Sequence, residues 1–356
     1  MPKTDYLQMD LGGSFKEFRL YSSRFQGSKR RVMPWLLEGI QNHATSGETI
    51  LDCYAGSGLV SYALTAKGFV VSASDQLLSA LISVQAMSGE SRDLDAGELK
   101  EALAYANSDV PGSELSSTYA GIFFPQDELL WLDRMSRFIQ ELPTEARPRA
   151  FWALFQSALA KRPYNLFHRA NLEMRTREVA RSFGNKTTWE KPFPVHFMKF
   201  ITEASTHALN SPNVSTFHGD PLAISSTEFD MVYLDPPYIN EKGQATPYID
   251  YYGFLDLLIQ PELLSRINQG KANKPIEPVV GGWNDSQAAL ETFEKLLKKF
   301  SDSKVALSYR SDGKPSAESL ESLMRTYRNK VTIYKKPLKY ALSSKNDAEE
   351  ILLVGE

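Results

Sequence analysis

Two short motifs carry the residues of this sequence that could do chemistry, and each follows an apolar run typical of a buried strand. The first is a glycine turn, Asp52-Cys53-Tyr54-Ala55-Gly56-Ser57-Gly58, between the apolar run 49–51 and a predicted helix over residues 59–66. Glycines are favoured there because the backbone must turn sharply and approach a ligand closely. A tight turn between a strand and a helix gives the same pattern without a ligand, so the glycine turn alone does not establish a binding site.

Two features of the glycine turn distinguish among the ligands it could hold. Ser61 replaces the third glycine of a dinucleotide-binding motif. Asp52 stands four residues before Gly56, where a carboxylate would repel a pyrophosphate but would suit a ligand with an ammonium group. S-adenosylmethionine has that group and no phosphate. Asp75, at the tip of the next predicted strand, is placed to accept two ribose hydroxyls, or else to cap a helix starting at Leu77.

The second motif is Asp235-Pro236-Pro237-Tyr238, directly after the apolar run 229–234. Two prolines make this loop stiff, at the sheet edge where open α/β sheets bind ligands. The loop suits the exocyclic amine of a nucleobase, a poor nucleophile because its lone pair is delocalised into the ring. The Asp235 carboxylate and the Pro236 carbonyl would accept its two hydrogens, and the Tyr238 ring would stack on a base that has left the duplex. A plain turn at the end of a strand is the alternative.

The elements around these motifs indicate an α/β domain built from both ends of the chain. Further strands are predicted over residues 69–73, 304–309, 331–334 and 349–354, whereas residues 93–181 have a mainly helical pattern. We therefore predict a Rossmann-like, doubly wound α/β sheet formed by residues 1–90 and 200–356, interrupted by a mainly helical, basic insertion over residues 91–199.

Composition excludes several classes of protein. The 356 residues are 42% hydrophobic and 23% charged, an ordinary globular balance that suggests about two domains. Cys53 is the single cysteine and the histidines lack metal-ligand spacing, so neither a disulfide within the chain nor a metal site is expected. We expect a cytoplasmic protein with no membrane partner, because the sequence has no long apolar run and no signal-peptide core near its start.

Basic residues are concentrated in the predicted insertion. Residues 134–199 contain thirteen Lys and Arg against five Glu and Asp, in a chain whose net charge is −3. This asymmetry favours contact with nucleic acid, although a solvated helix face gives a similar composition. The residues expected to meet phosphates are Arg169, Arg175, Arg177 and Arg181. Those expected to read bases, or to fill the gap left by a flipped base, are Asn171, Asn185, Lys186 and Trp189.

Taken together, the motifs resemble those of the S-adenosylmethionine-dependent DNA methyltransferases that modify amino groups, specifically the D12 class that acts on adenine N6. Residues 27–30, Gly-Ser-Lys-Arg, are similar to that family's N-terminal motif, and the glycine turn is similar to its D-x-F-x-G-x-G motif with Tyr54 replacing Phe. Asp235 to Tyr238 match its D-P-P-Y motif without departure, and residues 340–346 with 350–354 resemble its closing hairpin. The motif order resembles that of Dam-type enzymes, in which target recognition lies between the two catalytic motifs.

This resemblance implies roles for individual residues. Phe25 would pack on the adenine of the cofactor, Lys29 would contact its methionine end, and Asp75 would hold its ribose. Asp220 would accept a hydrogen bond from the amino group of the cofactor's own adenine, unless it is an ordinary turn residue before Pro221. The complete set expected to bind the cofactor is Phe25, Lys29, Asp52, Tyr54, Gly56, Gly58, Asp75, Asp220 and Asp235, and the expected catalytic residues are Asp235, Pro236, Pro237 and Tyr238.

The resemblance implies a site-specific enzyme that methylates N6 of a flipped adenine in double-stranded DNA by direct attack on S-adenosylmethionine. It would act in a restriction-modification, solitary or defence system, with a cognate restriction or defence component as a candidate partner. Three alternatives stay open. Cytosine-N4 methylation more often has Ser at the position of Asp235. A ribosomal-RNA amino methyltransferase is usually more compact than this chain. A non-catalytic DNA-binding module would not need Asp235 and Tyr238 intact.

Overall fold

The parallel strands that carry the two motifs lie side by side at the centre of a seven-stranded sheet. The computed structural model describes residues 19–177, 185–209, 214–240, 243–278, 282–337 and 349–356. The sheet has the order β3-β2-β1-β4-β5-β7-β6, in which β1 to β5 are parallel and β7 is antiparallel to both of its neighbours. Its strands are β1 (Thr49–Cys53), β2 (Val70–Asp75), β3 (Ser215–His218), β4 (Met231–Leu234), β5 (Lys304–Arg310), β6 (Val331–Pro337) and β7 (Glu349–Gly355).

The strand order reverses between β1 and β4, and this reversal brings the motifs together. The chain runs outward from β1 to β2 and β3 on one side, then returns to place β4 on the other. In the register of the pair, Cys53 lies opposite Leu234, so the glycine turn and the Asp235 loop leave the sheet next to each other. Open α/β sheets bind their ligands at such a switch point.

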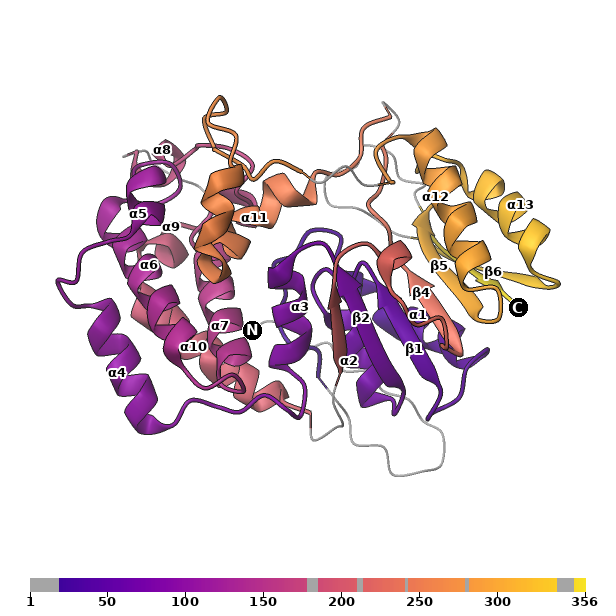
Figure 1. Cartoon of the computed structure of the whole chain (residues 1–356), viewed down its shortest axis with the longest axis horizontal. Coiled ribbons are helices and arrows are strands. Elements are labelled where there is room, and N and C mark those ends of the chain that lie inside the picture. The colour runs from indigo at the N-terminus through magenta and orange to yellow at the C-terminus, as the bar shows by residue number, and fades with distance from the viewer. Residues whose placement is uncertain (1–18, 178–184, 210–213, 241–242, 279–281, 338–348) are drawn as a thin grey trace.

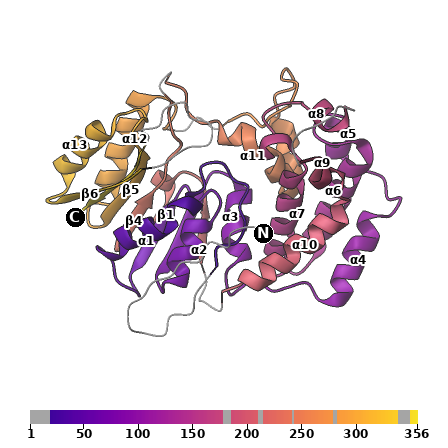
Figure 2. The same ribbon diagram turned by 180° about the vertical axis from the view of Figure 1, so that it is seen from behind.

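Apolar side chains alternate between two cores because both faces of the sheet are covered. Ile50 points to a core shared with α1 (Met33–Gln41), α2 (Leu59–Ala66) and α3 (Leu78–Ala86). Its neighbour Leu51 points to the opposite core, shared with α12 (Ser286–Lys299) and α13 (Ala317–Tyr327). Figure 1 shows α12 and α13 over one face, and Figure 2, seen from behind, shows α1 and α2 over the other.

A bundle of helices lies beside the β3 edge of the sheet, next to α3 (Figure 1). The central helix is α7, which is buried along nearly all of its length and packs against α6, α10 and α3. The bundle comprises α4 (Ala96–Ala106), α5 (Glu114–Thr118), α6 (Gln126–Glu141), α7 (Arg147–Ala160), α8 (Glu173–Thr176), α9 (Asn185–Glu190), α10 (Phe193–His207) and α11 (Tyr248–Ile259). Short 3-10 helices are η1 (Lys29–Arg31), η2 (Pro163–Asn165), η3 (Pro221–Ala223) and η4 (Pro261–Arg266).

The predicted α/β fold and each predicted strand are confirmed, and the predicted helix over residues 59–66 coincides with α2. Strand β3 was not predicted, because its four residues are not a buried apolar run. The division at residues 199 and 200 stays a prediction, but α10 runs across it, and α11 joins the bundle from the later part of the chain. The expected hairpin segment 340–346 lies outside the described residues. Among the described residues, no helix is long and apolar enough to cross a membrane.

Candidate active site

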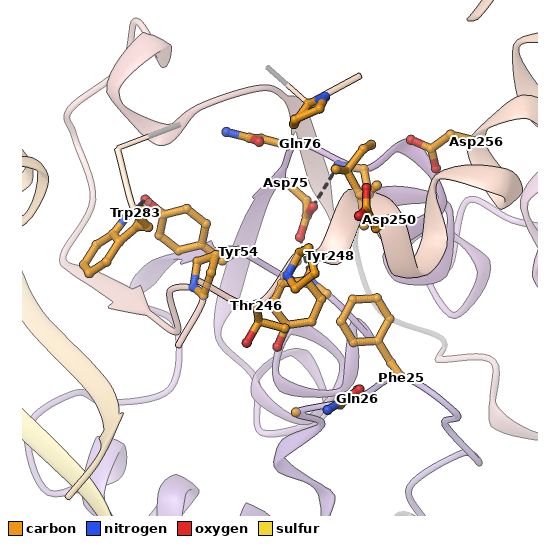
Figure 3. A pocket seen from close by; sticks show the side chains of 18 of the residues that line it. Phe25, Gln26, Tyr54, Asp75, Gln76, Thr246, Tyr248, Asp250, Asp256 and Trp283 are labelled. Carbon is orange, nitrogen blue, oxygen red and sulfur yellow. Dashed lines mark hydrogen bonds between the residues drawn. The ribbon is translucent and has the colours of Figure 1, made fainter. Parts of the chain in front are cut away.

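A cavity of about 450 Å³ lies at the carboxyl ends of β1, β2 and β4, where the two motifs meet. Its walls come from segments far apart in the sequence, namely η1, the glycine turn, the Asp235 loop, α11 and the stretch after η4. Figure 3 shows Phe25, Tyr54, Asp75 and Tyr248 lying around one space. Lining residues that the sequence predicted are Phe25, Lys29, Asp52, Tyr54, Gly56, Asp75, Asp235 and Pro237.

The glycine turn is compact for reasons that can be read from its neighbours. Gly56 and Gly58 both have positive φ, 51° and 73°, in the left-handed region that glycine adopts most easily. A Cβ on Gly58 would lie 2.9 Å from the Tyr21 hydroxyl and 3.1 Å from the Val84 backbone nitrogen. Close packing of the turn against α3 and the N-terminal segment therefore requires glycine at position 58. This position lies behind the cavity wall rather than on it.

Asp75 accepts two backbone hydrogen bonds and lies in the wall of the cavity, and its expected contact with a ribose stays a prediction. Its carboxylate accepts hydrogen bonds from the backbone N–H of Gly56 at 2.9 Å and of Leu77 at 2.8 Å, so it braces the glycine turn and the start of α3. It also lines the cavity. A carboxylate has about four acceptor sites, so two remain for a ligand. Burial raises the pKa of Asp75 to about 6, despite the two backbone hydrogen bonds.

Asp52 is fully buried at the base of the cavity and accepts a hydrogen bond from the Ser61 hydroxyl. Its pKa is raised to about 7. Burial is the main cause, the hydrogen bond from Ser61 lowers the pKa, and the negative charges of Asp235 and Asp75 raise it. Ser61, which stands where a dinucleotide-binding motif has its third glycine, thus donates a hydrogen bond to Asp52 on β1. Four carboxylates whose pKa values are raised by burial line the cavity, those of Asp52, Asp75, Asp235 and Asp256, and together they favour a positively charged neighbour.

Asp235 belongs to a cluster of charged groups. The Lys29 ammonium lies 2.7 Å from Asp235 Oδ1 and 2.9 Å from Glu350 Oε1, and the Tyr238 hydroxyl bonds both carboxylates at 3.2 Å. Lys29 also donates to the Tyr238 hydroxyl. Burial raises the pKa of Asp235 to about 6, although the Lys29 charge lowers it. Glu350 on β7 was not predicted as a site residue; its apolar neighbours in sequence marked only a strand.

An aromatic wall on α11 was also not predicted. Tyr248 and Tyr252 are one helical turn apart, and both stack on Phe25, at centroid distances of 5.4 Å and 4.2 Å. The Tyr252 hydroxyl accepts from the Gln26 backbone, and one turn further Asp256 accepts from the N–H groups of Leu78 and Ser79. The spacing of four between these three residues was the available signal. Figure 3 shows Tyr248 beside Phe25 at the cavity.

Of three further details among the predicted residues, Tyr54 belongs to the cavity lining, whereas Asp220 and Pro236 do not. Tyr54 has a positive φ of 66° and accepts a hydrogen bond from Trp283 Nε1 at 2.7 Å, so the two rings form one wall (Figure 3). Asp220 accepts from the Leu222 N–H at 2.8 Å and begins η3, as the turn interpretation expects, and it is outside the cavity lining. Pro236 is buried in the loop behind Pro237.

The sequence matches a known protein family over more than half of its length. A model of the D12 class N6 adenine-specific DNA methyltransferases matches residues 25–301. The chain belongs to this family. The type II methyltransferase M2.HphI of Haemophilus parahaemolyticus is similar to it, with 23% identity over 334 residues, which are 91% of this chain and 93% of the relative. The protein is therefore an adenine-specific DNA methyltransferase: its substrate is DNA, and it transfers a methyl group to N6 of adenine.

The methyltransferase presents only part of its basic segment to solvent. Arg169, Arg177 and Lys186 are exposed, and Lys186 lies 3.5 Å from Glu190 on the next turn of α9. Trp189 is half-buried. Arg181 lies outside the described residues. Asn185 begins α9.

The structure contradicts the expected roles of Arg175 and Asn171. The Arg175 side chain is 5% exposed and pairs with Glu128 at 2.8 Å, so it is not available to a phosphate. Asn171 is buried and accepts a hydrogen bond from Arg162, whose guanidinium also holds the carbonyl of Arg169. Both residues stabilise the inside of the helical bundle. Their sequence pattern was misleading because a charge count does not separate inward-pointing from outward-pointing side chains.

Proposed function

We propose that the cavity binds S-adenosylmethionine and that the Asp235 loop presents the amino group of a flipped adenine to it. The observation that carries this proposal is the meeting of both motifs around one cavity of about 450 Å³, with the carboxylates of Asp52, Asp75 and Asp235 on its wall. Such a volume is ordinary for the site of a small ligand. The surplus of carboxylates favours a cationic ligand over a phosphorylated one.

The residues present fit this methyl donor by their chemistry. Asp75 has acceptor sites to spare for two ribose hydroxyls. The buried charge of Asp52 suits an ammonium or sulfonium group, and the stacked rings of Phe25 and Tyr248 offer an apolar surface to an adenine. S-adenosylmethionine, when bound, would supply a methyl group on an electron-poor sulfur. Lys29, whose partners within the protein are two carboxylates and the Tyr238 hydroxyl, would face its methionine end.

The Asp235 loop would prepare the adenine amine for attack. Asp235 Oδ1 is occupied by Lys29 and Tyr238, so Oδ2 is the oxygen directed to an N6 hydrogen. The Pro236 carbonyl would accept the second hydrogen, and the two acceptors together would free the nitrogen lone pair. The Tyr238 hydroxyl is held by both carboxylates, which limits the rotation of its ring before a base stacks on it. The adenine must leave the duplex to reach this loop.

DNA would bind across the face on which the cavity opens, between the sheet and the helical bundle. Exposed cations on this proposed DNA face come from two segments, the predicted one (Arg169, Arg177, Lys186) and the rim of the cavity itself (Arg266, Lys271). Tyr164, next to the buried anchor Arg162, is 67% exposed with a positive φ of 59°. An exposed aromatic ring held in a strained turn suits insertion into a gap left by a flipped base.

The biological setting is proposed from the relative. M2.HphI is named a type II methyltransferase, and we propose that this enzyme likewise protects DNA in a restriction-modification system with a cognate endonuclease. A solitary or defence role is the alternative. Its substrate would place it in the cytoplasm.

The proposal is tested with purified protein, S-adenosylmethionine and double-stranded DNA of many sequences, read by modified-base sequencing. Wild type should produce N6-methyladenine at a defined motif. Asp235→Ala should abolish methyl transfer while DNA affinity stays within about threefold, because the carboxylate acts on the amine and not on the phosphates. Asp302→Ala, which removes an exposed acid after α12, is the matched control. An Asp235→Ala variant that methylates DNA at a rate near wild type would contradict the mechanism.

A further inference from the structure

We propose that Glu350 is a positioning residue of the methyltransferase, which holds the Asp235 carboxylate in place through Lys29 and Tyr238. The inference rests on the proposed function of Asp235, and it assigns a role to a residue of the closing strand that lies outside both motifs. Glu350 is 115 positions after Asp235 in the sequence, yet one ammonium and one hydroxyl connect the two carboxylates.

The cluster has a geometry in which every donor is used. An ammonium has three N–H donors, and Lys29 directs them to Asp235, Glu350 and the Tyr238 hydroxyl. The Tyr238 hydroxyl in turn lies 3.2 Å from each carboxylate. Because both contacts of Asp235 use Oδ1, rotation of its carboxylate is restrained. Oδ2 makes none of the hydrogen bonds or ion pairs found among the described residues, so it stays available to a substrate.

The members of the cluster differ in burial in a way that assigns their roles. The side chains of Lys29 and Glu350 are 4% and 3% exposed, whereas that of Asp235 is 19% exposed and lines the cavity. The Ser308 hydroxyl on β5 donates to Glu350 Oε1 at 2.7 Å and fixes it from behind. Glu350 therefore forms the rigid end of the cluster and Asp235 forms the end that meets the ligand.

Charge explains why a second carboxylate is needed. With Asp235 as its sole partner, the Lys29 ammonium would form a tight pair that draws the carboxylate away from a weak neutral donor such as an adenine amine. Glu350 shares the ammonium, so two carboxylates face the single charge of Lys29. The negative charge of Asp235, at the exposed end of the cluster, then lies where a cationic methyl donor and an amine that gains positive charge during the reaction would meet it.

The test compares Glu350→Gln with Glu349→Gln, its neighbour on β7, whose side chain is outside the cluster. Glutamine keeps the size and the acceptor atom for Ser308 but removes the charge. We expect the single-turnover rate of methyl transfer in Glu350→Gln to fall about 10- to 100-fold, with the affinities for S-adenosylmethionine and DNA within about threefold, as for a misplaced reacting group. Glu349→Gln should behave as wild type.

A pH profile separates positioning from a merely structural role. The charge of Glu350 raises the pKa of Asp235 and that of Lys29 lowers it, so loss of the Glu350 charge should move the acid limb of the rate profile to lower pH. The other titratable groups that face Asp235 are unchanged in the comparison: Asp52 on β1, Tyr233 on β4, Tyr238, and Tyr248 on α11. An unchanged rate, or a lower rate with an unmoved acid limb, would overturn the proposal.

Two further variants keep the result interpretable. If Glu350→Gln does not fold, Ser308→Ala replaces it, since loss of the 2.7 Å hydrogen bond should loosen Glu350 and lower the single-turnover rate several-fold; an unchanged rate refutes the role. Asp235→Ala is measured alongside. Activity in Asp235→Ala would contradict the proposed function itself, whereas an inactive Asp235→Ala with a fully active Glu350→Gln would contradict only the positioning role.

Discussion

Replacement of Asp52 by Asn should stabilise the ligand-free enzyme at pH 8 and weaken its methyl-donor binding. Asp52 is fully buried, and its pKa is raised from 3.8 to about 7, chiefly by burial. At pH 8 its charge therefore costs folding free energy that a bound cation would offset. Asparagine fits the same space and can accept the Ser61 hydroxyl, but it carries no charge. This substitution therefore measures separately how much the Asp52 charge destabilises the folded protein and how much it contributes to ligand binding.

The size of the effect follows from linkage. A carboxyl with a higher pKa in the folded than in the unfolded state binds more protons when folded between about pH 4 and pH 7, so its contribution to stability is lost as the pH rises through 7. For Asp52 this amounts to about 1.4 kcal/mol between pH 6 and pH 8. Asp75 and Asp235, with pKa values near 6, add about 0.4 kcal/mol each. Buried histidines with lowered pKa values act in the opposite direction.

The assay is urea unfolding of ligand-free wild type and Asp52→Asn at pH 6, 7 and 8, because the difference between the two proteins cancels the titratable groups that do not interact with Asp52. The advantage of Asp52→Asn in free energy of unfolding should be about 1.4 kcal/mol larger at pH 8 than at pH 6. Calorimetry should show S-adenosylmethionine affinity at pH 8 reduced by about 1–3 kcal/mol. Asp302→Asn, an exposed control, should change neither quantity. A difference that stays constant across this pH range would refute the assigned titration.

Three further predictions concern the supports of the site and the DNA face. Gly58→Ala should lower the free energy of unfolding by more than about 2 kcal/mol, because the left-handed φ of 73° and the Tyr21 hydroxyl both oppose a Cβ; urea unfolding measures this, and a neutral effect would contradict the crowding. Asp256→Ala should cost about 1–3 kcal/mol by the same measurement, since two N–H groups at the start of α3 lose a charged acceptor, and equal stability would show that water replaces it. Arg169→Ala should weaken binding to all DNA sequences and reduce the slope of log affinity against log salt by about one, without a change in the methylated motif; a changed motif would make Arg169 a base-reading residue.

Much of the catalytic half could be predicted because local sequence determines it. Strand β4 is a continuous apolar run that ends at Asp235, and β1 ends at the glycine turn. Parallel strands place their carboxyl ends at one edge of a sheet, so these two motifs had to lie near each other once β1 and β4 paired. The sequence could not indicate that Glu350 completes the same site, and the spacing of Tyr248, Tyr252 and Asp256 indicated one helix face but not what that face contacts. Their contacts depend on how β7 and α11 pack, and a single buried acid in a strand has no periodic signal.

The basic insertion shows where composition fails as a guide to function. Its excess of positive charge overstates the field that DNA would meet, because Arg149, Lys161, Arg162 and the side chain of Arg175 are buried within the bundle. Lys161 and Arg175 share Glu128, and Arg162 lies 4.8 Å from the Phe123 ring and donates to backbone carbonyls. Because such cations donate their hydrogen bonds to groups inside the protein, they add little attraction for phosphates. A phosphate contact therefore has to be assigned from exposure, which Arg169 and Arg177 retain and which Arg266 and Lys271 at the cavity, in a segment that the charge count did not single out, also have.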